Sequence, residues 1–327
     1  MFFELAKPDI GKVEKYMQKL IDAEPKGIYG MLLPYIMRGG KRMRPMLAIL
    51  CCRAAGGNPE KVIVPAAILE LFHNFSLIHD DIVDNSQFRR GEPTLHVSHG
   101  VPIALNSGDA LYTLVWRELM HLELPAKKRT DILRMFADTF KKVVEGQGTE
   151  LYWEQQKRFD IEEEEYLSMI DGKTSSLIGF SCELGAMIGS ADKPTCARLK
   201  RFGLMIGAAF QIHDDVLNVT GTFEKYKKEI GGDITEGKRT LMVVHCLKNS
   251  DEETKKKIIE ILLTHSRNPA DINFVINAME KAGSIKYARE KAMRLIDQAE
   301  TELSKLKPSE ARDALVAVCD YMGSRES

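Results

Sequence analysis

Residues 61–83 read KVIVPAAILELFHNFSLIHDDIV, and they form the longest apolar stretch of the chain. Drawn as a helix, the stretch is mostly apolar on every side until an acidic cluster appears in its last turn. A helix that is hydrophobic all round is buried among its neighbours instead of lying on a surface. These residues therefore predict a central helix that other helices surround.

The same helical spacing of apolar residues continues along nearly the whole chain, whereas two-residue alternation is scarce. Glycine and proline interrupt it at short intervals, and no proline- or serine-rich linker divides the 327 residues. The pattern predicts an all-α fold with a single domain over residues 1–327. Helices are expected over residues 10–37, 41–55, 61–83, 103–122, 127–153, 162–188, 196–219, 240–249, 254–266, 271–281, 284–306 and 309–322.

The composition excludes several classes of function. Lysine and arginine number 46 and aspartate and glutamate number 47, so no net field attracts nucleic acid or anionic lipid. The six cysteines form no C-x-x-C pair, which argues against a zinc site or a disulfide framework and indicates a reducing compartment. The charged N-terminus does not resemble a signal peptide, and we see no uncharged run long enough to cross a bilayer. We therefore expect a cytoplasmic protein with no transmembrane segment.

Two acidic clusters share one spacing. Residues 80–84 read DDIVD and residues 214–218 read DDVLN, each at the end of an apolar helical stretch. The first and fifth residues of each lie one helical turn apart on the same face, and two carboxylates at this spacing, as in residues 80–84, repel each other. Magnesium would compensate them, because it binds through one or two carboxylates together with substrate phosphates. The predicted ligands are Asp80, Asp84 and Asp214; the alternative for either cluster alone is a charged patch at a helix end.

Basic residues also gather around short loops, in residues 39–45 (GGKRMRP), 88–91 (FRRG), 172–174 (GKT), 227–228 (KK) and 237–239 (GKR). Singly, such residues are solvated surface charges; jointly with the acids, they predict a site for two diphosphates. One diphosphate would be bridged to carboxylates by magnesium and the other held by lysine and arginine. His73 lies two helical turns before Asp80 on the same face, where it either packs in the core or contacts substrate.

With these motifs the sequence resembles the trans-isoprenyl diphosphate synthase (polyprenyl synthetase) family. The resemblance rests on six segments that cover nearly the whole chain. They are GGKRMRP (39–45), LIHDDIVDNSQFRRGEPTLH (77–96), EGQGTEL (145–151), DGKTSSL (171–177), FQIHDDVLNVTG (210–221) and GGDITEGKRTL (231–241). The resemblance implies a single bundle of mostly antiparallel helices around a central cavity (the isoprenoid synthase fold). Proteins of this family are usually homodimers.

The resemblance also implies substrates, cofactor and site residues. Isopentenyl diphosphate would be condensed with an allylic diphosphate, with three Mg²⁺ ions in each substrate-bound site. The acidic residues that match the family's metal-binding and catalytic positions are Asp80, Asp81, Asp84, Asp214 and Asp215, with Lys173 also catalytic. Positions that match the allylic diphosphate pocket are Arg89, Lys173, Thr174, Gln211, Lys228 and Lys238. Those that match the isopentenyl diphosphate pocket are Gly40, Lys41, Arg44, His73 and Arg90.

Two residues depart from the family pattern. Asn218 closes the second acidic cluster where an aspartate is usual, which removes a charge but retains an oxygen ligand. Glu150 stands where an aspartate is commoner, three residues after Gln147, which matches the family. Both departures bear on how the third metal ion would be bound.

The length of the product should depend on residues upstream of Asp80. A helix rises about 1.5 Å per residue, which places Phe75 roughly 7.5 Å and Phe72 roughly 12 Å below that aspartate. Phe75 is bulky and Ser76 is small. An aromatic residue five positions before the first aspartate, and none four positions before it, resembles archaeal-type geranylgeranyl (C20) synthases. Farnesyl (C15) and geranylfarnesyl (C25) products, or ordinary core packing of these residues, are the alternatives.

Two other functions are compatible with part of the pattern. A class I terpene cyclase shares the first acidic motif, but its usual second motif does not occur after Asp214, and it needs no second basic pocket. A non-catalytic subunit of a heteromeric synthase tends to lose acidic residues, and this chain retains both clusters.

Overall fold

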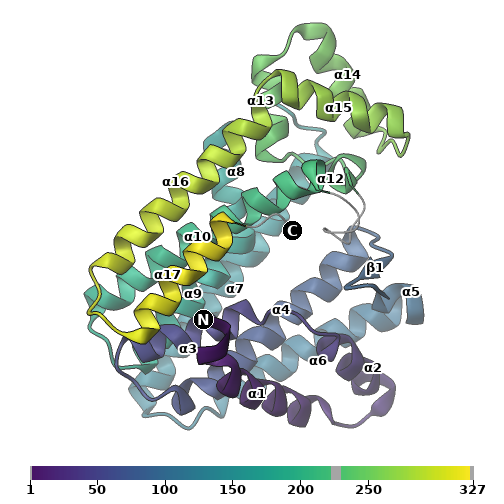
Figure 1. The fold of residues 1–327 in the computed structure, drawn as a ribbon. Helices are drawn as coiled ribbons and strands as arrows, with labels where there is room; N and C mark the ends of the chain where they lie inside the picture. The colour runs from purple at the N-terminus through teal and green to yellow at the C-terminus, as the bar shows by residue number, and fades with distance from the viewer. Residues whose placement is uncertain (1, 222–229, 325–327) are drawn as a thin grey trace. The chain divides into compact units, whose positions relative to one another are not determined.

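The computed structural model describes residues 2–221 and 230–324 and consists mainly of helices (Figure 1). Two short antiparallel strands, β1 (Phe88–Arg89) and β2 (Glu92–Pro93), form a hairpin. The chain forms two compact units, and each is built from separate segments. Unit 1 comprises residues 1–137, 180–200 and 306–317, and unit 2 comprises residues 138–179, 201–305 and 318–327.

Unit 1 contains the N-terminal helices and the hairpin. Its elements are α1 (Phe2–Ile21), α2 (Lys26–Met37), α3 (Met43–Ala54), η1 (Pro59–Val62), α4 (Ile63–Val83), α5 (Leu95–His99) and α6 (Val101–Met120). Four more helices have residues in both units: α7 (Ala126–Gln155), α9 (Ser176–Ile188), α10 (Lys193–Thr220) and α17 (Glu310–Gly323).

Helix α4 is the central helix that the apolar stretch predicts. It packs against α1, α3, α5 and α6, and its residues from Ala66 to Phe72 are fully or almost fully buried. By length and composition, the helix Pro59–Val83 is the one among the described residues that could cross a membrane, but 67% of its apolar window is buried inside the protein. The packing of unit 1 therefore accounts for the apolar composition of this stretch.

A buried ion pair fixes the loop before α3. Arg42 adopts a left-handed backbone conformation (φ 46°) and donates hydrogen bonds to Glu14 at 3.0 Å, to Glu70 of α4 at 3.0 Å and to the carbonyl of Ile36 at 2.7 Å. The side chains of Arg42 and Glu70 are 2% and 3% exposed. A buried cation needs such partners, because an unpaired charge is costly in the interior. Arg42 thus belongs to the scaffold of the basic segment.

Unit 2 contains the remaining helices. They are α8 (Glu163–Ile170), η2 (Asp171–Ser175), α12 (Gly232–Thr235), α13 (Leu241–Asn249), α14 (Glu252–Leu263), α15 (Pro269–Lys281) and α16 (Ser284–Ser304). Helix α16 packs against α13 and α15, and α8 against α13. The acidic run from Glu162 begins α8 with a capping box, in which the Glu165 carboxylate accepts a hydrogen bond from the Glu162 amide at 3.0 Å.

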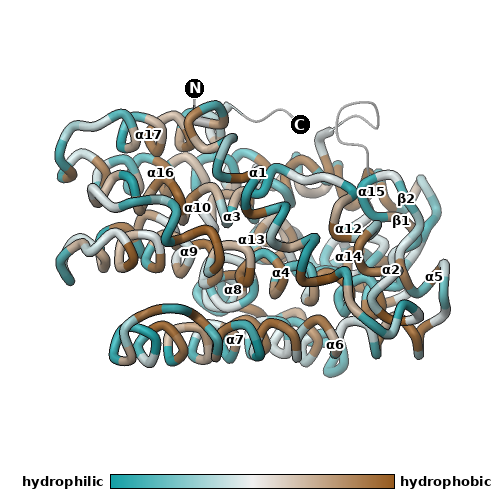
Figure 2. The backbone as a smooth tube through the Cα atoms, turned by 90° about the horizontal axis from the view of Figure 1, so that it is seen from below, coloured by the Kyte–Doolittle hydropathy of each residue, from teal (hydrophilic) through white to brown (hydrophobic). Residues whose placement is uncertain are grey.

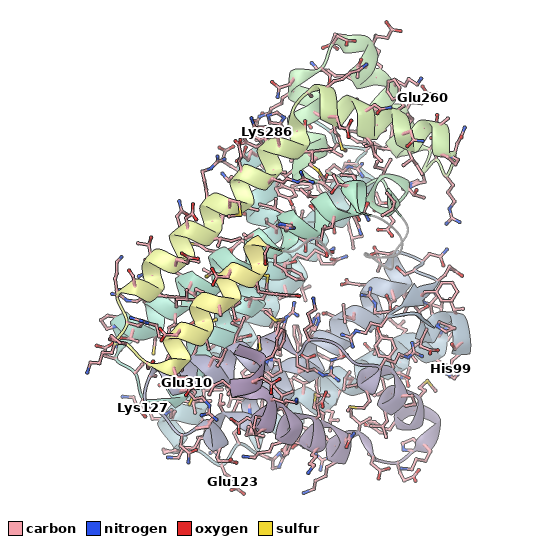
Figure 3. All side chains as sticks on the ribbon, viewed as in Figure 1. His99, Glu123, Lys127, Glu260, Lys286 and Glu310 are labelled. Carbon is pink, nitrogen blue, oxygen red and sulfur yellow. The ribbon has the colours of Figure 1, made fainter. Side chains whose placement is uncertain are left out.

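Amphipathic helices explain why periodicity predicted the fold well. Hydrophilic and hydrophobic residues alternate turn by turn along α7 (Figure 2). Charged side chains such as Lys127, Glu260, Lys286 and Glu310 are exposed and point outward (Figure 3). Of the elements that the sequence predicted, most agree with the structure to within a few residues.

Some predictions about individual elements were wrong. The helix expected over residues 10–37 is two helices, α1 and α2, because residues 22–25 interrupt it immediately before Lys26. The helix expected over residues 162–188 contains a π-helical segment, η2. Helices α5 and α12 and the β-hairpin were not predicted, since each is too short to show a period.

Candidate active site

The acidic cluster at the end of α4 contains one carboxylate that the fold itself engages. Asp81 is 1% exposed, and it accepts hydrogen bonds from the hydroxyl of Tyr35 at 2.8 Å and from Nε of Arg89 at 2.5 Å. Burial raises the pKa of Asp81, while Arg89 and Tyr35 act in the opposite direction. Asp80 and Asp84 remain partly exposed on the same helix. Asp81 therefore holds Arg89, and the two outer aspartates are better placed to meet a ligand.

The β-hairpin presents two arginines directly after this cluster. Arg90 (φ 55°) and Gly91 (φ 80°) form its turn, which explains the glycine after the arginine pair. Arg38 anchors the hairpin by donating a hydrogen bond to the carbonyl of Pro93 at 2.6 Å. Nη1 of Arg90 donates to the carbonyl of Gly39.

The backbone conformation favours glycine at position 40, and this contact adds to the preference. Gly40 has a φ of 125°, and a Cβ atom there would lie 2.9 Å from Nη2 of Arg90. The glycine pair thus lets the Arg90 guanidinium lie against the backbone. This geometry brings the predicted residues Gly40 and Arg90 together in unit 1.

Arg44 and His73 lie in an electropositive, buried environment in unit 1. Burial lowers the pKa of Arg44 to about 10, Glu70 acts against this, and the charge of Arg90 lowers it further. Burial, followed by the charges of Arg44 and Arg90, lowers the pKa of His73 well below its usual value. Nε of Arg44 is buried with no hydrogen-bond partner among the described residues. The basic side chains of Arg44, His73 and Arg90 favour an anionic ligand, because a bound anion would compensate the positive charge of the arginines. Lys41, three residues before Arg44 in the sequence, has an exposed side chain.

Aromatic side chains of α4 and α6 pack below the acidic cluster. The ring of Phe75 lies 4.9 Å from Tyr112 of α6, 5.5 Å from Phe72 and 4.7 Å from His79, measured between centroids. The ring of Trp116 lies 6.2 Å from Tyr112, one helical turn further along α6. Phe75 is therefore part of an aromatic wall to which α6 contributes.

The second acidic cluster lines a pocket of about 100 Å³ in unit 2. Its lining includes Asp214 and Asp215 of α10, Asp233 of α12, Lys173 of η2 and Lys238. Acids and bases that the sequence predicted separately thus come together in one cavity. Lys228 lies outside the described residues.

Asp215 is the buried member of this cluster. It is 7% exposed and accepts hydrogen bonds from the hydroxyl of Tyr166 and from Nε2 of Gln211, both at 2.9 Å. Burial, together with the negative charges of Asp233 and Asp214, raises the pKa of Asp215 to about 8. Gln211 in turn accepts a hydrogen bond from the hydroxyl of Thr174 at 2.9 Å.

Lys173 reaches this pocket through a close approach of two helical segments. Gly146 of α7 faces Gly172 of η2, and a Cβ atom on Gly146 would lie 2.7 Å from the Gly172 carbonyl carbon. Lys173 forms an ion pair with Glu150. Burial alone would raise the pKa of Glu150, but the charges of Lys173 and Lys238 bring it below its usual value. Glu150, one of the two departures from the family pattern, is therefore an ionised partner of Lys173.

Asn218, the other departure, orders the turn that carries Asp233. Its side-chain oxygen accepts a hydrogen bond from the Asp233 amide at 3.1 Å, and its carbonyl accepts one from the Gly231 amide at 2.8 Å. Asp233 forms an ion pair with Lys238 at 3.4 Å. Asp233 was not among the predicted site residues, although its place directly after Gly231 and Gly232 was a signal.

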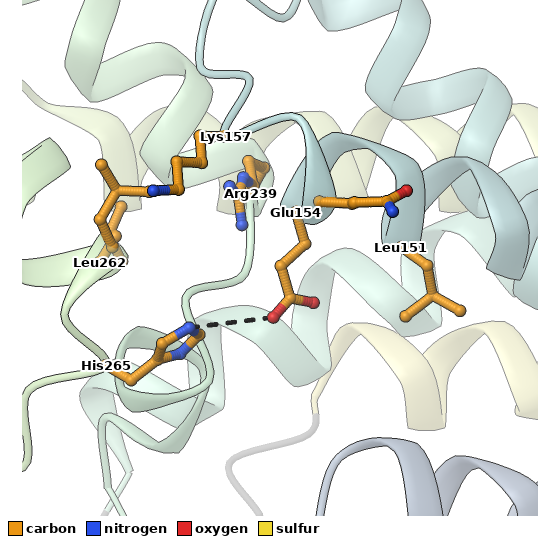
Figure 4. A pocket seen from close by; sticks show the side chains of 8 residues that line it. Leu151, Glu154, Lys157, Arg239, Leu262 and His265 are labelled. Atoms are coloured by element: carbon orange, nitrogen blue, oxygen red, sulfur yellow. Dashed lines mark ion pairs between the residues drawn. The ribbon is translucent and has the colours of Figure 1, made fainter.

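A second cavity of unit 2, of about 380 Å³, shares one residue with the acidic pocket (Figure 4). This residue, Arg239, donates hydrogen bonds to the carbonyls of Gly237, Arg158 and Trp153, and it lies over the ring of Phe159. Across the cavity, His265 and Glu154 approach to 3.9 Å. Arg239 therefore connects the end of α7 to the segment that presents Lys238.

A family profile described as Polyprenyl synthetase matches residues 26–279. The chain belongs to the polyprenyl synthetase family. It is 37% identical over 313 residues to the short chain isoprenyl diphosphate synthase of Methanothermobacter thermautotrophicus, covering 96% of this chain and 95% of the relative. The same coverage holds for the geranylgeranyl pyrophosphate synthase of Geoglobus acetivorans, at 33% identity. The geranylfarnesyl diphosphate synthase of Natronomonas pharaonis is 30% identical, with 95% of this chain and 94% of that protein covered.

Solved structures of the polyprenyl synthetase family share the fold. Geranylgeranyl pyrophosphate synthetase from Pyrococcus horikoshii superposes with a TM-score of 0.93 at 34% identity, covering 99% of this chain and 98% of that one. Polyprenyl synthase from Caulobacter crescentus, complexed with calcium and isoprenyl diphosphate, gives a TM-score of 0.91 at 26% identity and covers 100% and 97%. The chain is thus all-α with the isoprenoid synthase fold, and it is a short-chain trans-prenyltransferase.

Polyprenyl synthetases use divalent metal ions, and the residues of unit 2 fit one. Asp214, Asp215 and Asp233 offer oxygen atoms only, in a pocket where burial and the charges of its two neighbours raise the pKa of Asp215. No group of three or more His, Cys, Asp or Glu within the described part of the chain is arranged to hold a metal unaided. Magnesium suits such a donor set, since it retains water and phosphate oxygens as ligands.

Proposed function

We propose that the chain synthesises geranylgeranyl diphosphate by adding isopentenyl diphosphate to allylic diphosphates. The observation that carries the C20 product is the packing of Phe75 against Tyr112 at 4.9 Å, because it fixes a bulky ring about five residues below Asp80. A growing chain that extends along α4 would meet this wall. Relatives named as geranylgeranyl synthases support the proposal, alongside a relative named for the longer geranylfarnesyl product.

The proposal gives the two basic sets different roles. Arg44, Arg90, His73, Lys41 and the backbone of Gly40 bind the diphosphate of isopentenyl diphosphate; the buried Nε of Arg44 supports this. The allylic diphosphate is bound by Lys173, Lys238, Lys228 and Arg89, with Thr174 and Gln211 beside its reacting carbon. Asp80 and Asp84 of unit 1 and Asp214 of unit 2 would hold magnesium, with three ions in the substrate-bound enzyme, and the ions would neutralise the charge of the leaving diphosphate.

The reaction proceeds by ionisation, condensation and elimination. The allylic C–O bond breaks, and its electron pair leaves with the diphosphate, which the lysine and arginine side chains stabilise. The double bond of isopentenyl diphosphate then donates its electron pair to the allylic cation. A proton leaves the adjacent carbon for the released diphosphate, which regenerates a double bond and gives the product one isoprene unit longer. The apolar walls exclude water, which would otherwise capture the cation.

We further propose that the protein is a cytoplasmic homodimer. Exposed apolar side chains on α5 and α6 support an interface there: Val97, Val101, Ile103, Leu105 and Met120 are 45–62% exposed. Sedimentation equilibrium measures the mass directly.

Purified protein is expected to convert isopentenyl diphosphate and a C5, C10 or C15 allylic diphosphate to a C20 product when magnesium is present. Products are dephosphorylated and identified by mass, with parallel reactions that lack isopentenyl diphosphate or contain a chelator. Turnover without isopentenyl diphosphate would indicate a cyclase instead. If no primer is extended until a second protein is added, the chain is a subunit of a heteromeric synthase.

Phe75→Ala is expected to shift the main product from C20 to C25 or longer, since removal of the ring opens the wall on its α4 side. Tyr112→Ala should extend the product as well, because Tyr112 supports Phe75 from α6. Phe180→Ala serves as a control, since that ring packs against Phe136 and not against this wall. An unchanged product distribution in both wall variants would exclude the aromatic wall as the length determinant.

A further inference from the structure

Four residues of unit 2 form a hydrogen-bonded chain, and three of them, Tyr166, Gln211 and Asp215, line the acidic pocket. The hydroxyl of Tyr166 (α8) donates to Oδ2 of Asp215 (α10), whose Oδ1 accepts from Nε2 of Gln211. Oε1 of Gln211 accepts from the hydroxyl of Thr174 (η2), and all three distances are 2.9 Å. The chain links the metal-binding cluster to the residues beside the allylic carbon.

The bond directions in this chain follow from the atoms that face one another. Nε2 of Gln211 lies against Oδ1 of Asp215, and an amide nitrogen can only donate a hydrogen bond. The carbonyl oxygen of Gln211 therefore faces Thr174, and the Thr174 hydroxyl must donate its hydrogen to it. A hydroxyl that donates in one direction keeps its lone pairs for another.

We propose that Tyr166 is a positioning residue that fixes this direction and so turns the lone pairs of Thr174 toward the allylic cation. By occupying Oδ2, Tyr166 prevents the Asp215 carboxylate from rotating away from Gln211. Tyr166 is 1% exposed, and packing alone would be met by a phenylalanine. The inference rests on the proposed placement of the allylic substrate beside Thr174 and Gln211.

Tyr166→Phe removes only the hydroxyl, and it is expected to lower kcat about tenfold while the KM for isopentenyl diphosphate changes less than twofold. The fraction of allylic substrate released as its alcohol, by capture of the cation with water, should rise several-fold. Tyr287→Phe is the matched control. Tyr287 likewise donates its hydroxyl hydrogen to a partly buried carboxylate, that of Glu163, but neither residue lines the acidic pocket. It should leave both quantities unchanged.

A double-mutant cycle separates positioning from general stability. If Tyr166 acts through Thr174, then Tyr166→Phe should have less than a twofold effect on kcat when Thr174→Val is already present. Thr174→Ser, which retains the hydroxyl, should restore the sensitivity to Tyr166→Phe. Independent, multiplicative effects in the cycle would overturn the inference.

The remaining outcomes are also decisive. If circular dichroism shows that Tyr166→Phe does not fold, Gln211→Met takes its place in the double-mutant cycle with Thr174→Val. Multiplicative effects of these two substitutions on kcat would likewise overturn the inference. An unmodified protein that extends no primer would refute the proposed function, and the inference with it. An active unmodified protein whose Tyr166→Phe variant matches it in kcat and alcohol release refutes the inference alone.

Discussion

Asp80→Asn is expected to lower kcat/KM for the allylic diphosphate by about a thousandfold, the scale seen when a group that stabilises developing charge is removed. The substitution keeps the shape of the side chain and removes its charge. Asp81 cannot substitute for it, because both of its oxygens accept hydrogen bonds from Tyr35 and Arg89. We therefore expect the loss of kcat/KM to arise from weaker binding of the metal–diphosphate complex.

The measurement is steady-state kinetics over a range of magnesium concentrations. The variant should need a higher concentration for half-maximal rate, since one carboxylate ligand is lost. Asp138→Asn, at an exposed position of α7, is the control and should behave as the unmodified chain does. Retention of more than a tenth of the activity at unchanged magnesium dependence would contradict the assignment of Asp80.

Arg44→Gln is expected to raise the KM for isopentenyl diphosphate about a hundredfold and to change kcat far less. Nε of the guanidinium is buried and has no partner among the described residues, and desolvation lowers the pKa of Arg44 to about 10. A bound diphosphate would satisfy the donor and the charge together. Arg44→Lys should recover only part of the affinity, since an ammonium group lacks the planar fork.

Arg134→Gln is the matched control, because Arg134 is exposed on α7. Each variant is assayed with isopentenyl diphosphate varied at saturating allylic substrate, and then with the roles exchanged. A KM effect confined to the allylic substrate would place Arg44 in the other pocket and refute its assignment.

The sequence predicted the parts of this structure that depend on local pattern. Helix α4 could be identified because it is apolar throughout, and the two acidic clusters because their spacing repeats. The break between α1 and α2 was missed, since apolar spacing continues on both sides of residues 22–25. A period reports which residues face the core, but it does not report where the helix axis changes direction.

Differences among similar residues could not be predicted, because tertiary partners cause them. Asp80 and Asp81 are equivalent in a motif, yet the hydroxyl of Tyr35 from α2 and Nε of Arg89 from the hairpin donate their hydrogen bonds to Asp81. Tyr112 and Tyr166 look like ordinary core residues in the sequence, and only their neighbours in space distinguish them. The proposed roles of the basic residues rest on the family resemblance.

The π-helical segment η2 has a consequence for the phase of the helix that contains it. Residues 171–175 hold one more residue per turn than an α-helix would, and Lys173 and Thr174 both lie there. Because the wider turn takes up the extra residue, removing one residue from this segment would restore a regular α-helix and leave α8 nearly in phase with the residues that follow. Removing one residue from the α-helical part, between Tyr166 and this segment, would instead rotate Tyr166 by about 100° away from Asp215. A chimera between family members can therefore tolerate a one-residue difference inside η2, but not in the α-helix that leads into it.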